Sequence, residues 1–167
     1  MGANMRYIDK RIGVICDQLA KLAVVQKIPI ENLLYKEGNY LRPEDADAAE
    51  VEFKPFDSKL MYWYGPDKHY WFQADFTVPE SLDNKPMWLK VATQIDGWDA
   101  RNPQFLVFIN GVVTQGLDTN HREVLVTRSA KAGDTYRFDL QAYTGTEHSE
   151  FKLIAEVQEI DPKIVEL

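Results

Sequence analysis

The stretch "FLVFINGVVTQG", residues 105–116, decides the fold class of this chain. Residues 105–109 are apolar at every position, which is typical of a strand that is covered on both faces of its sheet. Asn110 and Gly111 follow at once. This dipeptide between two β runs predicts a two-residue hairpin, because both turn positions need a positive φ angle. Residues 112–116 then form the return strand, so the stretch predicts an antiparallel pair.

Alternating runs lie on both sides of this hairpin. Every second side chain of residues 70–78 is apolar, and Pro79 ends that run. Similar runs follow at 87–95, 122–127, 135–145 and 150–160. Turn residues such as Asp83 and Asn84 separate them. Short strands joined by turns, with no helix between them, predict a mainly β protein, an antiparallel jelly-roll β-sandwich.

The first part of the chain has a different period. Residues 1–28 predict an amphipathic N-terminal helix, which Pro29 stops. We expect its apolar stripe to dock on the chain's own domain, with pairing to a second copy as the alternative. Membrane-surface binding is disfavoured because the polar face is mixed in charge. The stripe has spacings of four, three, four and three residues, at Ile8, Ile12, Ile15, Leu19 and Leu22.

The rest of the chain divides into two segments. Residues 29–60 are expected to be an irregular connection, with "RPEDADAAEVE" at 42–52 forming a solvated loop or a short helical turn. Residues 61–167 are expected to be the β-sandwich domain. The length of 167 residues fits one compact unit overall.

Composition excludes several classes of protein. The net charge of −7 disfavours a surface that tracks nucleic-acid phosphates. No stretch is long and apolar enough to span a bilayer, and residues 1–13 lack the apolar core of a secretory signal. The single cysteine, Cys16, allows no internal disulfide and fits a reducing compartment. We therefore expect a cytoplasmic protein with neither nucleic acid nor membrane as partner.

Catalytic patterns are weak in this sequence. There is neither a G-x-S-x-G elbow nor a phosphate-binding glycine loop. Asp118, His121 and Glu123 are metal-ligand types, but one local cluster is weak evidence for a metal, and a braced loop explains the same residues. Glycoside hydrolysis by a pair among Asp96, Asp99 and Asp118 is disfavoured because the chain offers no second half to enclose a substrate. We expect no catalytic residue, no bound metal and no cofactor in this chain.

Polar residues come directly before the first strand of the central hairpin and directly after its second strand. Aromatic rings can stack on sugar C–H groups while polar side chains bind hydroxyls, so these residues are candidates for carbohydrate binding or for a domain interface. Trp63 and Trp71 are candidates for an aromatic platform, although Trp71 is also expected to pack on the outside of the sheet against the N-terminal helix. The framing candidates are Trp98, Asp99, Asn102, Gln104, Asp118, Asn120, His121 and Arg122.

The framed stretch "DGWDARNPQFLVFINGVVTQGLDTNHREVLV", residues 96–126, strongly resembles part of the N-terminal domain of glycoside hydrolase family 38 α-mannosidases of the bacterial and fungal-vacuolar type. "HYWFQADFTVPESLDNKPMWLKV" at 69–91 and "AGDTYRFDLQAYTGTEH" at 132–148 match the same domain in the same order. The resemblance covers residues 60–150 well and the preceding segment more loosely.

The resemblance implies a galactose-binding-like jelly roll that precedes a catalytic domain. In that family the divalent metal and the nucleophile belong to the catalytic domain, so neither is carried over to a position here. The parent activity would be retaining hydrolysis of terminal α-mannosides. The chain ends at "DPKIVEL", about where the catalytic domain is expected to begin.

Three hypotheses about function follow from the residues and the resemblance. The first is a non-catalytic domain whose partner is the catalytic domain of the same α-mannosidase. The second is an independent carbohydrate-binding module that takes a mannose-containing glycan. The third is an assembly domain that forms a homo-oligomer through the N-terminal helix.

Overall fold

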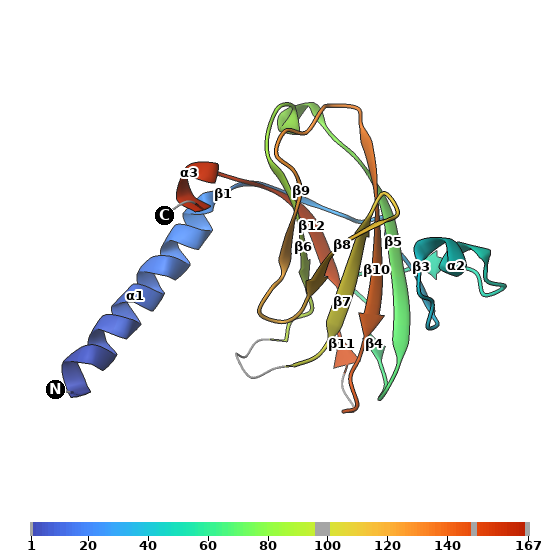
Figure 1. The fold of residues 1–167 in the computed structure, drawn as a ribbon, viewed down its shortest axis with the longest axis horizontal. Coiled ribbons are helices and arrows are strands. Elements are labelled where there is room, and N and C mark those ends of the chain that lie inside the picture. Colours follow the sequence, from blue (N-terminus) through green and yellow to red (C-terminus); the bar gives the residue numbers. More distant parts are fainter. Residues whose placement is uncertain (1, 96–100, 148–149, 166–167) are drawn as a thin grey trace.

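The computed structural model describes residues 2–95, 101–147 and 150–165. Two antiparallel sheets face each other, which confirms the mainly β sandwich (Figure 1). The four-stranded sheet has the order β1 (Val24–Pro29), β12 (Ile154–Ile160), β6 (Met87–Ala92) and β9 (Glu123–Thr127). The six-stranded sheet has the order β3 (Lys54–Pro55), β2 (Leu34–Glu37), β5 (His69–Thr77), β10 (Thr135–Tyr143), β7 (Gln104–Ile109) and β8 (Val112–Leu117).

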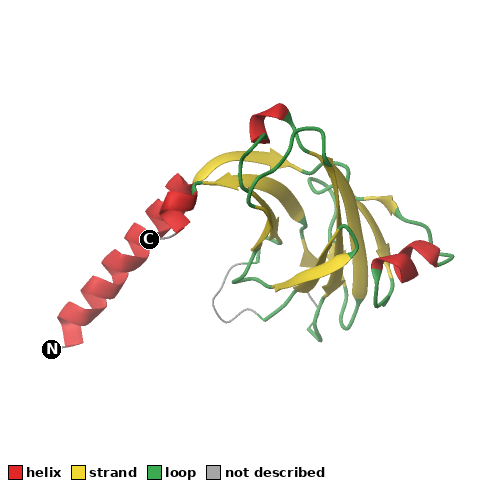
Figure 2. Cartoon of the chain, turned by 45° about the horizontal axis from the view of Figure 1, so that its top comes forward, coloured by secondary structure: helices red, strands yellow, loops and turns green. Residues whose placement is uncertain are grey.

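Smaller elements complete the described chain (Figure 2). A short ladder joins β4 (Trp63–Tyr64) to β11 (Glu150–Phe151). The helical elements are α1 (Gly2–Ala23), α2 (Pro43–Ala48), the 3-10 turn η1 (Glu80–Leu82) and α3 (Pro162–Val165). Together with the two stacked sheets, these elements form a β-sandwich, and α1 is attached at one side of it.

The predicted hairpin at Asn110-Gly111 is confirmed. Asn110 has φ 50° and Gly111 has φ 78°, and Ile109 pairs directly with Val112 across the turn. Positive φ at both central positions gives a turn whose twist matches that of the two strands. The far ends of β7 and β8 also meet, because Phe105 pairs with Leu117. The hairpin therefore places the residues around 101–104 beside those around 117–122.

The alternation of each strand builds the core between the two sheets. Phe72 of β5, Val107 of β7 and Val157 of β12 are completely buried there, and Leu89 and Leu140 are nearly so. Since successive side chains of a strand point to opposite faces, each of these strands also presents a second set of side chains outward. β7 lies between β10 and β8, as its unbroken apolar run predicts.

Helix α1 differs from the prediction in two ways. It ends at Ala23 rather than at residue 28, because Val24–Pro29 pair with β12 as strand β1. The helix also does not dock on the sandwich, and its main packing contacts are with β1 and α3. In both views it extends away from the sheets, with the N-terminus farthest out (Figures 1 and 2). The expected docking is wrong, since Ile12 is 53% and Leu22 70% exposed.

Residues 29–60 are more ordered than the sequence indicates. β2 pairs with β5 inside the six-stranded sheet, and α2 covers part of that sheet's outer face. Pro43 at the first turn of α2, with Glu44 and Asp45 beside it, favours a helix start. The short helical turn that the sequence allowed is therefore present, and the segment belongs to the sandwich.

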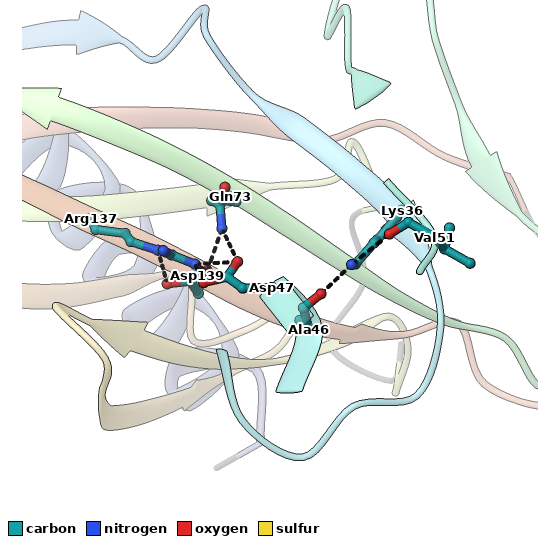
Figure 3. Close-up of polar contacts among 7 residues, drawn as sticks. All are labelled: Lys36, Ala46, Asp47, Val51, Gln73, Arg137 and Asp139. Carbon is teal, nitrogen blue, oxygen red and sulfur yellow. Dashed lines mark hydrogen bonds and ion pairs between the residues drawn. The ribbon is translucent and has the colours of Figure 1, made fainter. Parts of the chain in front are cut away.

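Polar side chains anchor α2 to the sheet (Figure 3). Lys36 Nζ donates hydrogen bonds to the carbonyl oxygens of Ala46 and Val51, the latter at 2.8 Å. Arg137 contacts the Asp47 carboxylate at 2.8 Å and the fully buried Asp139 at 2.9 Å. Burial lowers the pKa of Lys36, and the nearby Asp47 carboxylate opposes that shift. Such buried charges are tolerated because each has hydrogen-bonding partners.

Candidate functional site

The predicted polar residues gather at one end of the sandwich. The loop from β8 to β9 lies there, as do the described parts of the connections from β6 to β7 (93–95 and 101–103) and from β10 to β11 (144–147) (Figure 1). Trp98 and Asp99 lie outside the described residues. The structure places the other six candidates on these loops or directly beside them, at Asn102, Gln104, Asp118, Asn120, His121 and Arg122.

Asp118 organises the loop between β8 and β9. Its Oδ1 accepts the backbone N–H groups of His121 at 2.7 Å and Asn120 at 2.8 Å. The His121 ring Nδ1 lies 3.2 Å from the same oxygen. The backbone hydrogen bond from His121 is the largest of several contacts that lower the pKa of Asp118. Among the described residues, no three potential ligands gather into a metal site. The loop is thus braced locally around one carboxylate.

Arg122 ties this loop to its neighbour. Its Nε donates to the Thr119 carbonyl oxygen at 2.6 Å, and its Nη2 donates to the Ile95 carbonyl oxygen at 3.2 Å. The next residue, Glu123, contacts Lys90 Nζ at 3.1 Å on the adjacent strand. The planar guanidinium presents several donors in a fixed fork, which suits it to fixing backbone carbonyl groups. Arg122 therefore sets the position of both loops.

Asn102 and Gln104 are held at the same end. A β-carbon built on Gly145 would lie 2.4 Å from Asn102 Nδ2, so the two residues are in close contact. Gln104 donates to the Arg101 carbonyl oxygen at 3.2 Å. Gln104 also pairs with Tyr143, whose ring stacks on His69 with centroids 4.8 Å apart. These side chains form an ordered polar surface with one aromatic stack on it.

The predicted aromatic platform is wrong for Trp63. This side chain is only 1% exposed and sits in the core, with the rings of Tyr70, Phe72, Phe105 and Phe151 at centroid distances of 5.0–5.6 Å. Its indole N–H donates to the Lys152 carbonyl oxygen at 3.2 Å. Both ring faces are covered, so Trp63 cannot stack on a ligand.

Trp71 is also unavailable as a platform, for a different reason. It points outward from β5, as its alternation predicts, yet it is completely buried because the segment around α2 covers it. Its ring lies 5.6 Å from that of Phe108. Among the described residues, nothing accepts a hydrogen bond from its Nε1. The segment that packs on Trp71 is thus α2 and not the N-terminal helix.

Sequence reasoning missed Trp88. The alternation that puts Met87 and Leu89 in the core puts Trp88 on the outer face of the four-stranded sheet, so the signal was present. Trp88 pairs with Gln158 on one side and with Leu125 on the other. It is half-buried and lines a groove of about 1190 Å³ between this face and α1.

A second pocket, of about 900 Å³, lies where the chain crosses from β1 to β2. Its polar groups mostly serve the fold. Asp57 Oδ1 accepts the Lys59 N–H at 2.8 Å, Lys152 Nζ donates to the Lys59 carbonyl oxygen at 2.8 Å, and Asn32 donates to the Asp75 carbonyl oxygen. Asp57, Lys152 and Asn32 are therefore engaged with backbone groups of the fold.

The described part of the chain contains no helix that is long and apolar enough to cross a membrane. No family model matches the sequence, and no curated protein matches it.

Comparison with solved structures identifies the fold. The chain is similar to a β-glucuronidase from Ruminococcus gnavus in complex with D-glucuronic acid, with TM-score 0.51 and 9% identity over 80% of this chain and 29% of that one. It is also similar to a putative β-galactosidase from Bacteroides fragilis, with TM-score 0.56 and 11% identity over 80% of this chain and 23% of that one. The chain thus shares a β-sandwich fold with part of each of these proteins, and it spans less than a third of their length.

Proposed function

We propose that this chain is a non-catalytic domain of a glycoside hydrolase, specifically an α-mannosidase, and that it supports the catalytic domain. The sandwich resembles a part of a β-glucuronidase and of a β-galactosidase, both glycosidases by name. The sequence resemblance of residues 96–126 to family 38 narrows the proposal to α-mannosidases. A fold alone does not define a function, so the proposal also depends on the polar residues at the end of the sandwich where these loops lie.

The observation that carries the proposal is the bracing of that end. Arg122 fixes two loops through the carbonyl oxygens of Thr119 and Ile95, and Asp118 fixes further backbone groups within the first of these loops. Loops that are ordered before contact lose little conformational entropy on binding. Interfaces between domains of one chain are also more polar than cores. A pre-ordered polar surface suits a rigid contact with a neighbouring domain and the rim of its sugar site.

The test compares the 167-residue chain with the full-length enzyme on a chromogenic α-mannoside. We expect turnover only by the full-length enzyme, and turnover by the chain alone would overthrow the non-catalytic role. In the full-length enzyme, Arg122→Met should lower activity, because the loops lose their common anchor. Lys131→Met, a change at an exposed lysine on a distant turn, serves as the control and should leave activity unchanged.

A second candidate function is assembly through α1. Its apolar stripe is more than half exposed at Ile8, Ile12 and Ile15, and the spacing fits one face of a helix pair. Exposed apolar stripes of this kind mark interaction sites. Light scattering of the chain with and without residues 2–22 decides this point. A monomer in both cases would exclude assembly through the helix.

A further inference from the structure

We propose that the groove between α1 and the outer face of the four-stranded sheet binds a saccharide that carries a negative charge. The groove is formed by residues from α1, β1, β6, β9 and β12 and is separate from the braced loop end, apart from Arg122 and Glu123 at its rim. The sugar part of this ligand, a mannoside, rests on the proposed function, whereas its charge is inferred from the groove itself.

The centre of the groove is a row of side chains that crosses all four strands. Lys27 of β1 pairs with Gln158 of β12, Gln158 pairs with Trp88 of β6, and Trp88 pairs with Leu125 of β9. Directly paired residues of an antiparallel sheet point to the same face and lie about 4.5–5.5 Å apart. The side chains of Trp88 and Lys27 therefore stand on either side of the buried Gln158, within the length of one or two sugar rings.

Trp88 and Lys27 are the members of the row that a sugar can reach, since Lys27 is exposed and Trp88 is half-buried. The indole of Trp88 offers a flat apolar face to sugar C–H groups, and the groove around it is concave. Gln158, which lies between Trp88 and Lys27, is only 1% exposed and donates to Glu156, so it supports the row from below and is closed to a ligand. Neither Trp63 nor Trp71 offers such a face, because both are buried. Trp88 is thus the described tryptophan that can stack on a ligand.

The charge of the groove argues for an anionic group on the sugar. Four cationic side chains and two anionic ones line it, although the protein as a whole has a net charge of −7. Lys90 is paired with Glu123, and Arg122 is engaged with backbone carbonyls. Lys21 and Lys27 also line the groove and form no ion pair within the described residues, although the carboxylate of Asp17, on the same helix as Lys21, lines it too. Lysine ammonium groups bind phosphate, sulfate or carboxylate as point charges.

The test titrates the full 167-residue chain with mannose 6-phosphate and with methyl α-mannoside, and follows the Trp88 indole N–H signal by NMR. We expect the charged sugar to bind more tightly, and added salt to weaken it because exposed charges are screened. Lys27→Glu should weaken binding of the phosphate sugar by about tenfold, as reversal of a charge at a binding site does. Lys131→Glu, the same charge change on a distant turn, should have little effect.

Several results would overturn the proposal. These are no shift at millimolar concentrations of either sugar, equal affinity for the neutral and the charged sugar, or equal effects of Lys27→Glu and Lys131→Glu. If inorganic phosphate binds as tightly as the phosphate sugar, the groove recognises the phosphate group and not a saccharide. Trp88→Ala should abolish stacking, and if that variant unfolds, the exposed Lys27 variant still decides the question.

Failure of this inference and failure of the proposed function can be told apart. If the chain binds neither sugar while the full-length enzyme hydrolyses α-mannosides and depends on Arg122, only the groove assignment is wrong. If glucuronate binds as the phosphate sugar does but no α-mannosidase activity is found, the anionic site stands and the mannoside assignment is wrong.

Discussion

The carboxylate of Asp139 is completely buried, and it accepts hydrogen bonds from Arg137 Nε at 2.9 Å and Arg137 Nη2 at 3.0 Å. Gln73 and Arg137 both also reach Asp47, so α2 and strands β5 and β10 share one polar network (Figure 3). The pKa of Arg137 is raised, first because its guanidinium donates to Asp139. The Arg137–Asp139 pair, through Asp47, therefore links the six-stranded sheet to the α2 segment that covers its outer face.

Arg137→Met should destabilise the domain strongly. Removing one partner leaves the carboxylate of Asp139 buried without its counter-charge, which costs on the order of 3 kcal/mol. Urea denaturation of the variant measures this loss. Arg128→Met removes an arginine from an exposed position and should change stability by less than about 0.5 kcal/mol. Equal midpoints for the two variants would contradict the role of the buried pair.

Gly145→Ala should cost more than Gly133→Ala. Both glycines have a positive φ angle, 88° and 87°, so both variants bear a backbone penalty of about 1–2 kcal/mol. Only Gly145 has Asn102 within 2.4 Å of the new β-carbon, whereas nothing lies within 4 Å of it at Gly133. The difference between the two unfolding free energies isolates the contact with Asn102. If the two variants are equally stable, the loop end is more loosely packed than the structure indicates.

Asp118 should contribute stability that depends on pH. Its folded-state pKa is lowered, chiefly by the backbone N–H of His121, so the contribution is complete above the unfolded value of about 3.9 and is lost as the pH falls through the lowered value. Asp118 is 39% exposed, so we expect an effect below about 1 kcal/mol. Denaturation of the wild type and Asp118→Asn at pH 7 and pH 3 checks the sign. The difference between them should shrink at pH 3, and a difference that grows would be evidence against this role.

The two buried tryptophans should respond differently to phenylalanine. Trp63→Phe leaves the Lys152 carbonyl oxygen without the indole donor that bonds to it at 3.2 Å. Trp71→Phe removes an N–H that has no acceptor among the described residues, which relieves a desolvation cost. We expect Trp63→Phe to be more destabilising than Trp71→Phe by about 1–2 kcal/mol. Thermal unfolding of both variants measures the difference, and the reverse order would refute the assignment of their N–H groups.

The candidate site was only partly predictable. The described polar residues on both sides of the hairpin come to one end because β7 and β8 pair from the Asn110-Gly111 turn as far as Phe105 and Leu117, with a register shift between Val107 and Phe108. Their partners were not predictable, since Arg122 reaches Ile95, which lies 27 positions earlier in the chain. Trp88 could have been found from strand alternation alone. The groove beside it could not, because α1 forms the opposite wall.

The sequence by itself determined the fold class, the hairpin and the inward face of each strand. These follow from period-two alternation and from turn residues that tolerate positive φ, which act between near neighbours in the chain. Only the tertiary structure decided which faces are covered. Trp71 and Trp88 both point outward from their strands, yet α2 buries the first, while a wide groove is left over the second. That difference depends on contacts between distant segments, such as Asp47 with Arg137, and no local pattern encodes them.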